Sequence, residues 1–171
     1  MLPNLWQRLD QGARHLLPFI STLLFTLGSV VAWPLPYLGA VAPSLALVAV
    51  YYWAIHRPDL FGPGSACAIG LLCDVLNKLP LGMSALVFVA LHQLVLSQRR
   101  FFSGQAFFVL WAGFAIAMVI AMLSNWLISS LVGRQMIPLT PVLLQGLLTI
   151  TVFPLPAWLL IRLQRVALSQ G

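Results

Sequence analysis

The chain has 171 residues, of which 61% are hydrophobic and only 7% are charged. Soluble domains carry about a quarter charged residues, whereas apolar runs of about 20 residues, the length that crosses a bilayer, recur along this whole sequence. The composition excludes an ordinary soluble protein. It predicts a single polytopic membrane domain over residues 1–171, with no separate soluble domain.

The net charge of +6 comes from nine Lys and Arg residues against three acidic residues. The cations are scattered between apolar runs and form no stripe or arm, so we expect them to set topology and to contact anionic lipid rather than nucleic acid. The two cysteines, Cys67 and Cys73, are six residues apart in one predicted helix. They point to different faces of that helix, so they predict neither a disulfide nor a metal site.

Six membrane helices are predicted in chain order from the apolar runs and the residues that interrupt them. The first run resembles a signal peptide, but it leads directly into further spans and is interpreted as a membrane helix. Prolines, glycines and charged turns separate the rest. The predicted helices are Leu16–Val31, Tyr37–Ile55, Leu60–Asn77, Leu81–Ser97, Gln105–Leu131 and Pro141–Ile161.

The third run is short and rich in glycine, so a five-span interpretation would merge or omit it. Charge placement favours six spans, because a cytoplasmic N-terminus then puts seven cations inside and two outside. The inside set is Arg8, Arg14, Arg57, Arg99, Arg100, Arg162 and Arg165, and the outside set is Lys78 and Arg134. We therefore expect an all-α bundle of six transmembrane helices with both termini cytoplasmic. Near its predicted interfaces lie Trp6, Trp33, Trp53 and Trp158, as in an aromatic belt.

The stretch AIGLLCDVLNKLPLGM, residues 68–83, places a carboxylate, Asp74, inside an apolar run. Small and polar residues recur every four positions around it and so share one helix face. These residues are Gly62, Ala66, Gly70, Asp74 and Lys78. Small residues let membrane helices approach closely. The glycine and alanine positions are therefore predicted to receive a partner helix, and Lys78 is predicted to pair with Asp74.

Two roles are open for Asp74. In the architectural one, it forms a buried ion pair or caps the turn at Gly82 and so holds the hairpin of the third and fourth spans. In the functional one, it is a proton or ligand site, because placing an ionisable residue in a membrane costs about 2.5 to 3.5 kcal/mol. A relay needs several such groups, and Asp74 is the only acid within the predicted spans. The architectural role is therefore favoured.

The other polar residues of the spans indicate no chemistry. His92-Gln93 and Ser124-Asn125 are expected to form hydrogen bonds across helices. The sequence contains no nucleophile elbow, phosphate loop, zinc-binding helix motif or carboxylate pair. We therefore expect no enzymatic activity, no cofactor and no metal site.

Two prolines, Pro154 and Pro156, lie within the last predicted span. Each removes a backbone donor, so the span should kink. The carbonyl groups left free would be satisfied by neighbouring helices or by the hydroxyls of Thr149 and Thr151.

The order of features from residue 47 to residue 100 resembles the rod shape-determining protein MreD family. YYWAIHRP (51–58) ends a span, GLLCD (70–74) and LPLG (79–82) follow, and the next span ends in Arg-Arg-Phe (99–101). The positions that match the family's pattern are Gly70, Asp74, Pro80 and Gly82. The resemblance implies a non-enzymatic component of the bacterial inner membrane that serves the machinery building the lateral cell wall. It also implies a fold similar to the six-helix substrate-binding subunits of energy-coupling-factor transporters.

The partners that the resemblance implies are MreC, a single-span protein with a periplasmic domain, and with it the actin-like MreB, the glycosyltransferase RodA and a penicillin-binding transpeptidase. The alternative is a vitamin-binding subunit of an energy-coupling-factor transporter. Against this alternative, the outward loops WPLPYLG and NKLP are short and offer few polar groups. A channel or proton-coupled carrier is disfavoured because the acid is alone.

Overall fold

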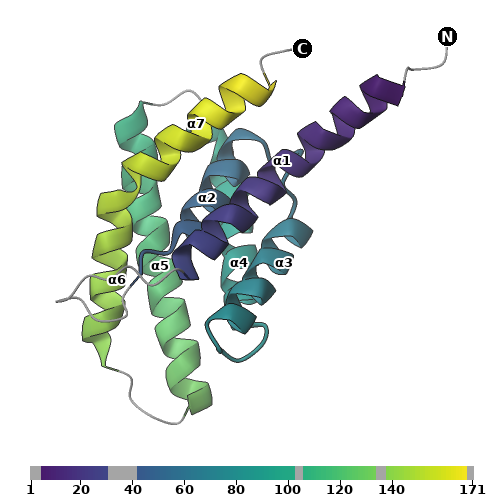
Figure 1. The fold of residues 1–171 in the computed structure, drawn as a ribbon. Helices are drawn as coiled ribbons and strands as arrows, with labels where there is room; N and C mark the ends of the chain where they lie inside the picture. The colour runs from purple at the N-terminus through teal and green to yellow at the C-terminus, as the bar shows by residue number, and fades with distance from the viewer. Residues whose placement is uncertain (1–4, 31–41, 103–105, 134–137, 169–171) are drawn as a thin grey trace.

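The computed structural model describes residues 5–30, 42–102, 106–133 and 138–168. The described residues form helices and no strand (Figure 1). The helices are α1 (Leu5–Val30), α2 (Leu45–His56), α3 (Pro63–Leu76), α4 (Met83–Phe102), α5 (Phe107–Gly133), α6 (Leu139–Val152) and α7 (Pro154–Leu168). The predicted all-α class is therefore confirmed, with seven helices in the described part where six were predicted.

Helix α2 forms the centre of the core. All its residues from Ala46 to Ile55 are buried, as expected for a helix that is apolar on every side. It contacts α1, α4, α5 and α7. The indole of Trp53, which is fully buried, donates a hydrogen bond of 3.0 Å to the hydroxyl of Ser21 in α1. Trp53 therefore belongs to the core, not to the interfacial belt that the sequence predicts.

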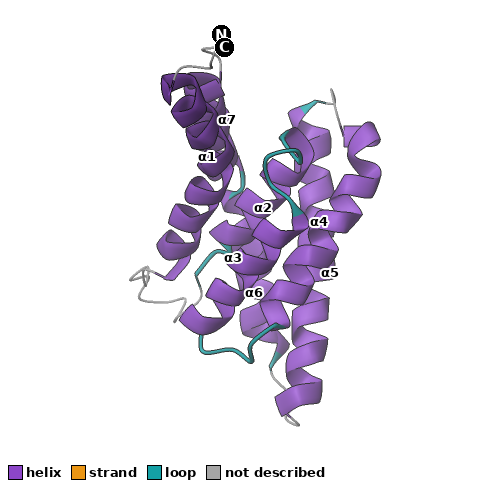
Figure 2. Ribbon diagram, turned by 90° about the vertical axis from the view of Figure 1, so that its right-hand side faces the viewer, coloured by secondary structure: helices purple, strands orange, loops and turns teal. Residues whose placement is uncertain are grey.

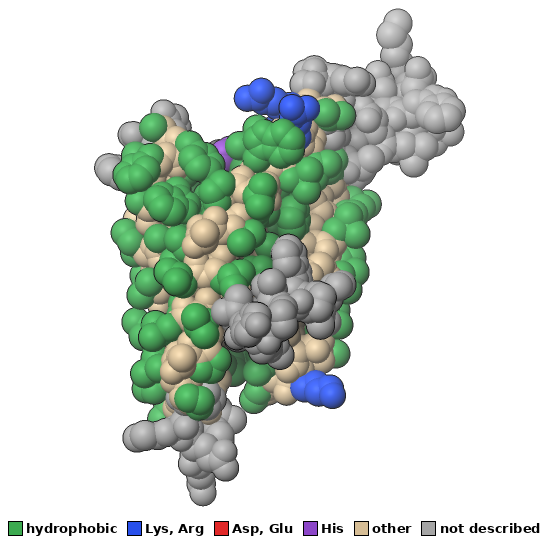
Figure 3. Space-filling model, turned by 60° about the vertical axis from the view of Figure 1, so that its left-hand side comes forward, with side chains coloured by type: hydrophobic (Ala, Val, Ile, Leu, Met, Phe, Trp, Pro, Cys, Tyr) green, Lys and Arg blue, Asp and Glu red, His purple; other side chains and the backbone are tan. Residues whose placement is uncertain are grey.

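Helix α1 begins and helix α7 ends at the same end of the bundle, referred to below as the end with the termini (Figure 2). Helices α2 and α4 also end there, whereas the α3–α4 turn lies at the opposite end (Figure 1). The end with the termini therefore carries Arg57, Arg100, Arg162 and Arg165, and the opposite end carries Lys78. One face of the molecule shows hydrophobic side chains between basic ends (Figure 3). Among the described residues, the end that carries the four arginines is thus the more basic of the two.

By length and composition, one described helix is clearly able to cross a membrane alone, namely α5 over Phe107–Leu131. Helices α6 and α7 meet the same criterion when taken together, with a bend of 45° between them. Helix α2 has 12 residues and α3 has 14, so they are about 18 and 21 Å long against an apolar bilayer thickness of about 30 Å.

Several predicted boundaries are wrong. The first helix begins at Leu5 rather than Leu16. The second begins at Leu45, directly after the non-helical residues 42–44, and its predicted start at Tyr37 lies outside the described residues. Proline at position 43 explains this start, because it disfavours helical geometry in the residue before it. The fourth helix extends to Phe102.

The predicted kink in the last span is confirmed at the break between α6 and α7. Pro154 has no N–H, so the carbonyl of Ile150 loses its partner four residues on. The indole N–H of Trp111 in α5 donates to that carbonyl at 3.0 Å. Thr149 and Thr151 instead donate to carbonyls four residues earlier in α6. Of the two alternatives, the neighbouring helix is therefore confirmed for the carbonyl of Ile150, since Trp111 belongs to α5, and the threonine hydroxyls do not serve it.

Candidate functional site

The predicted site residues lie in the hairpin of α3 and α4, the two helices that contact each other most extensively. Asp74, in the last turn of α3, is fully buried. Its Oδ2 accepts a hydrogen bond from the N–H of Gly82 at 2.8 Å, and its Oδ1 accepts one from the N–H of Ser84 at 2.9 Å. The first N–H groups of a helix have no partner within it. Asp74 of α3 thus caps the N-terminus of α4.

This cap stabilises the charge of a carboxylate that lies in an apolar run. Hydrogen bonds to an ionised acceptor are stronger than neutral ones, and the N-terminus of a helix carries partial positive charge. Of the two architectural possibilities for Asp74, the geometry is that of a cap on the turn at Gly82. The predicted ion pair with Lys78 is absent. Among the described residues, a salt bridge instead joins Arg57 and Asp59, with 3.5 Å between Nε and Oδ2.

Lys78 instead ends α3. Its φ of 55° is left-handed. The N–H of Leu79 donates to the carbonyl of Asp74 at 2.9 Å, and that of Lys78 to the carbonyl of Val75 at 3.4 Å. This is the Schellman arrangement, in which a left-handed residue closes a helix and satisfies its last carbonyls. The side chain of Lys78 is exposed.

Pro80 and Gly82 complete the turn. A proline shortly after a helix end prevents the helix from continuing, and the carbonyl of Pro80 accepts the N–H of Met83 at 3.3 Å. Gly82 has a φ of +96°, which glycine adopts without a steric penalty. Its carbonyl accepts the N–H of Leu86 at 2.9 Å and so starts α4. The Leu-Pro-Leu-Gly segment therefore reverses the chain and positions two donors for Asp74.

The small-residue face of α3 is largely covered by the chain itself. A Cβ at Gly70 would lie 2.6 Å from the backbone nitrogen of Ala85, so α4 packs directly on this glycine. Ala66 is fully buried. Gly62 precedes α3 and has open space around its Cβ position. The prediction that this face receives a helix of another protein is wrong at Gly70, because α4 occupies that place.

His92 joins the other end of the same hairpin. It is 1% exposed, and its Nε2 lies 2.8 Å from the carbonyl oxygen of Phe61, just before α3. A carbonyl only accepts, so Nε2 carries the proton of this bond. His92 thus forms a contact between elements, as predicted, whereas Ser124 donates within its own helix to Ile120. Asp74 and His92 together tie α3 to α4 at both ends.

The arrangement is suited to holding helices in place. Both oxygens of Asp74 are engaged by backbone donors. Within the described ranges, no three His, Cys, Asp or Glu side chains gather as a metal site would require.

Comparison with known proteins identifies one family. The model of one family, described as rod shape-determining protein MreD, matches residues 12–164. No curated protein matched, and neither did any solved structure. The family match includes the complete α3–α4 hairpin and most of the 171 residues. The chain therefore belongs to the MreD family of bacterial membrane proteins that determine rod shape.

Proposed function

We propose that this protein is a non-enzymatic scaffold of the bacterial cell-elongation complex, which maintains cell shape by binding MreC in the inner membrane. The match of the MreD family over residues 12–164 carries the proposal. Through MreC the scaffold links peptidoglycan synthesis by RodA and a penicillin-binding transpeptidase to the actin-like MreB. The comparisons lend no support to the vitamin-transporter alternative.

The proposed topology has six spans, with α6 and α7 forming one bent span and both termini in the cytoplasm. Two observations support it. Helix α1 begins and helix α7 ends at one end of the bundle (Figure 2), and the arginines that follow α2 and end α4 and α7 lie at that same end. Such an excess of cations marks the cytoplasmic side of membrane proteins.

The partner helix of this proposal docks outside the Ala66 and Gly70 positions. Gly70 and Ala66 are buried against this chain, so substitutions there test folding rather than partner binding. Exposed apolar side chains on α5 and α6 offer surface to lipid and to membrane partners; among them are Leu123, Leu127, Leu143 and Leu147.

The experiment that tests the function is purification of the tagged protein from its native membranes in mild detergent, followed by mass spectrometry of what accompanies it. We expect MreC, with RodA and its transpeptidase. A tagged, unrelated multi-span protein prepared in the same way is the control. Recovery of a cytoplasmic ATPase pair with its membrane coupling protein would instead identify a transporter subunit.

Topology has its own test, based on single cysteines in a variant whose Cys67 and Cys73 are replaced by alanine. Lys78 and Arg162 both have exposed side chains. A membrane-impermeant maleimide added to intact cells should label Lys78→Cys and should leave Arg162→Cys unlabelled until the cells are opened. The reverse pattern would contradict the proposed orientation.

A further inference from the structure

Helix α3 lies at the edge of the bundle and presents one side to its surroundings. It packs chiefly on α4 and α1. Four residues at intervals of four, three and four share its other face and are exposed. These residues are Gly64, Ala68, Leu71 and Val75. Val75, near the end of the helix, is 61% exposed. In a membrane protein, an apolar face of this kind meets lipid.

Charged residues lie at both ends of this face. Before α3, Arg57 and Asp59 form the salt bridge described above, and their side chains are 37% and 61% exposed. After α3, the exposed Lys78 begins the turn into α4. The helix between them has 14 residues and is about 21 Å long. It is therefore about 9 Å shorter than the apolar core of a typical bilayer.

A short helix cannot remove this mismatch by tilting, because a tilted helix spans even less of the bilayer. The bilayer can become thinner, or a long cationic side chain can extend to the headgroups. Lys78 has such a side chain, but Asp59 does not, since its carboxylate sits close to the backbone. Thinning is the response that brings the headgroups to both ends of α3.

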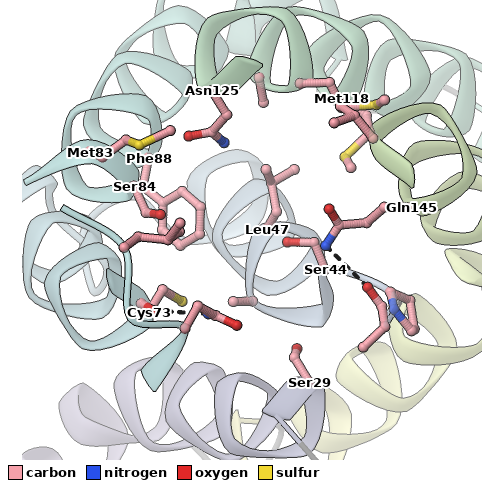
Figure 4. A pocket seen from close by; sticks show the side chains of 18 of the residues that line it. Ser29, Ser44, Leu47, Cys73, Met83, Ser84, Phe88, Met118, Asn125 and Gln145 are labelled. Atoms are coloured by element: carbon pink, nitrogen blue, oxygen red, sulfur yellow. Dashed lines mark hydrogen bonds between the residues drawn. The ribbon is translucent and has the colours of Figure 1, made fainter. Parts of the chain in front are cut away.

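The other short helix of the core does not meet lipid. Helix α2 has 12 residues, but those from Ala46 to Ile55 are all buried. Leu47, near its start, lines an internal cavity and is surrounded by other helices (Figure 4). The first N–H groups there are also satisfied by protein, because the N–H of Leu45 donates to the hydroxyl of Ser29 at 3.1 Å. The length of α2 therefore places no demand on the bilayer.

Helix α5 differs from α3 in length and is exposed to the same surroundings. Its apolar span, Phe107–Leu131, has 25 residues and is about 37 Å long. At the end of the bundle where α3 turns into α4, α5 extends beyond that turn (Figures 1 and 2). The apolar surface is thus longer on the α5 side of the molecule than on the α3 side.

We propose that the exposed face of α3 binds phospholipids in a locally thinned part of the bilayer and therefore selects short acyl chains from the surrounding lipid. The phosphate groups of these lipids lie level with Arg57 and Lys78, whose positive charges attract them. The proposal goes beyond the scaffold function and does not depend on it, because it concerns this chain and lipid alone.

The test compares two faces of the full chain in vesicles. A bimane fluorophore is attached at Leu71→Cys on α3 or at Ile116→Cys on α5, in the variant whose Cys67 and Cys73 are alanine. Leu71 is 39% exposed and Ile116 is 65% exposed, so neither label displaces a core residue. The vesicles contain a long-chain phosphatidylcholine that carries a nitroxide quencher. This lipid is diluted to the same mole fraction with either dimyristoleoyl- or dioleoylphosphatidylcholine, of which the first has the shorter chains.

Quenching reports which lipid lies against each label. At Leu71 we expect the dimyristoleoyl lipid to displace the quencher lipid about twofold better than the dioleoyl lipid does, since mismatch costs are modest. At Ile116 the two lipids should displace it equally. A label at Ala68→Cys, on the same face of α3, should repeat the result for Leu71.

Three outcomes would overturn the proposal. Equal displacement by the two lipids at both α3 positions would show that α3 does not select short chains. The same preference at Ile116 would assign the selection to the whole molecule rather than to α3. Labels on α3 that no nitroxide lipid quenches would show that the face is covered by a second copy of the chain. Failure of the scaffold function would leave each of these results unchanged, so the two proposals are tested separately.

Discussion

The carboxylate of Asp74 in α3 accepts a hydrogen bond of 2.9 Å from the backbone N–H of Ser84 in the first turn of α4. The same carboxylate accepts one from Gly82. One buried charge thus joins the end of one helix to the start of the next. Its removal would leave the buried N–H of Ser84 and the half-buried N–H of Gly82 without an acceptor, which makes Asp74 a stability determinant.

Asp74→Asn is expected to destabilise the fold by about 1 to 3 kcal/mol. The amide oxygen can accept from one N–H group, but the amide nitrogen then faces the other donor. The measurement is the temperature at which detergent-solubilised protein loses its monodisperse peak in size-exclusion chromatography, which should fall. A variant that keeps its stability and assembles, while cells still lose their rod shape, would argue for an active role of the charge.

Gly70→Ala should also destabilise the hairpin, by about 1 to 3 kcal/mol, the usual cost of overpacking. The added methyl group would meet the backbone of Ala85, which cannot move as a flexible side chain can. Gly64→Ala in the same helix is the control, because nothing lies within 4 Å of its Cβ position. Equal thermal stability of the two variants would show that the close contact is unimportant.

Lys78→Gly is expected to stabilise the protein by about 1 kcal/mol, because a non-glycine residue in the left-handed region is strained. Lys78→Gln keeps a side chain at φ 55° and removes only the charge, so it should leave the unfolding temperature unchanged. A clear loss of stability in Lys78→Gln would instead support the predicted ion pair between Lys78 and Asp74.

Trp111→Phe should lower stability by about 1 to 3 kcal/mol. The variant retains an aromatic ring but leaves the carbonyl of Ile150 without its donor at the bend between α6 and α7. Trp158→Phe is a suitable control, since Trp158 is 55% exposed. Circular dichroism during heating gives the unfolding temperatures of the two variants. Equal temperatures would show that the hydrogen bond from Trp111 does not stabilise the bend.

The order of helices and the kink were predictable because apolar runs and prolines act locally. The absence of an ion pair between Asp74 and Lys78 was not, because their spacing of four residues suits such a pair on a helix. Helix α3 ends at Leu76, so the spacing rule no longer applies at Lys78. The cap on Ser84 could not be identified, because it joins residues ten positions apart across a turn.

The sequence also did not indicate which apolar residues are buried within the bundle. Lipid is as apolar as a protein core, so hydropathy does not separate a central helix from a lipid-facing one. This explains why Trp53 was expected at an interface but is fully buried in α2. Likewise, the small residues of α3 indicated that a helix would pack on them, but not that α4 of the same chain would be that helix.

The shortness of α3 has a consequence for biogenesis. With 14 residues, it is about 21 Å long, which is shorter than the apolar bilayer thickness of about 30 Å. We therefore expect it to insert poorly by itself. Helix α4 has 20 residues, and the donors that engage Asp74 lie in its first turn and in the residue just before it. We therefore expect the two helices to leave the translocation machinery as one hairpin, with the acid already shielded when it enters the lipid.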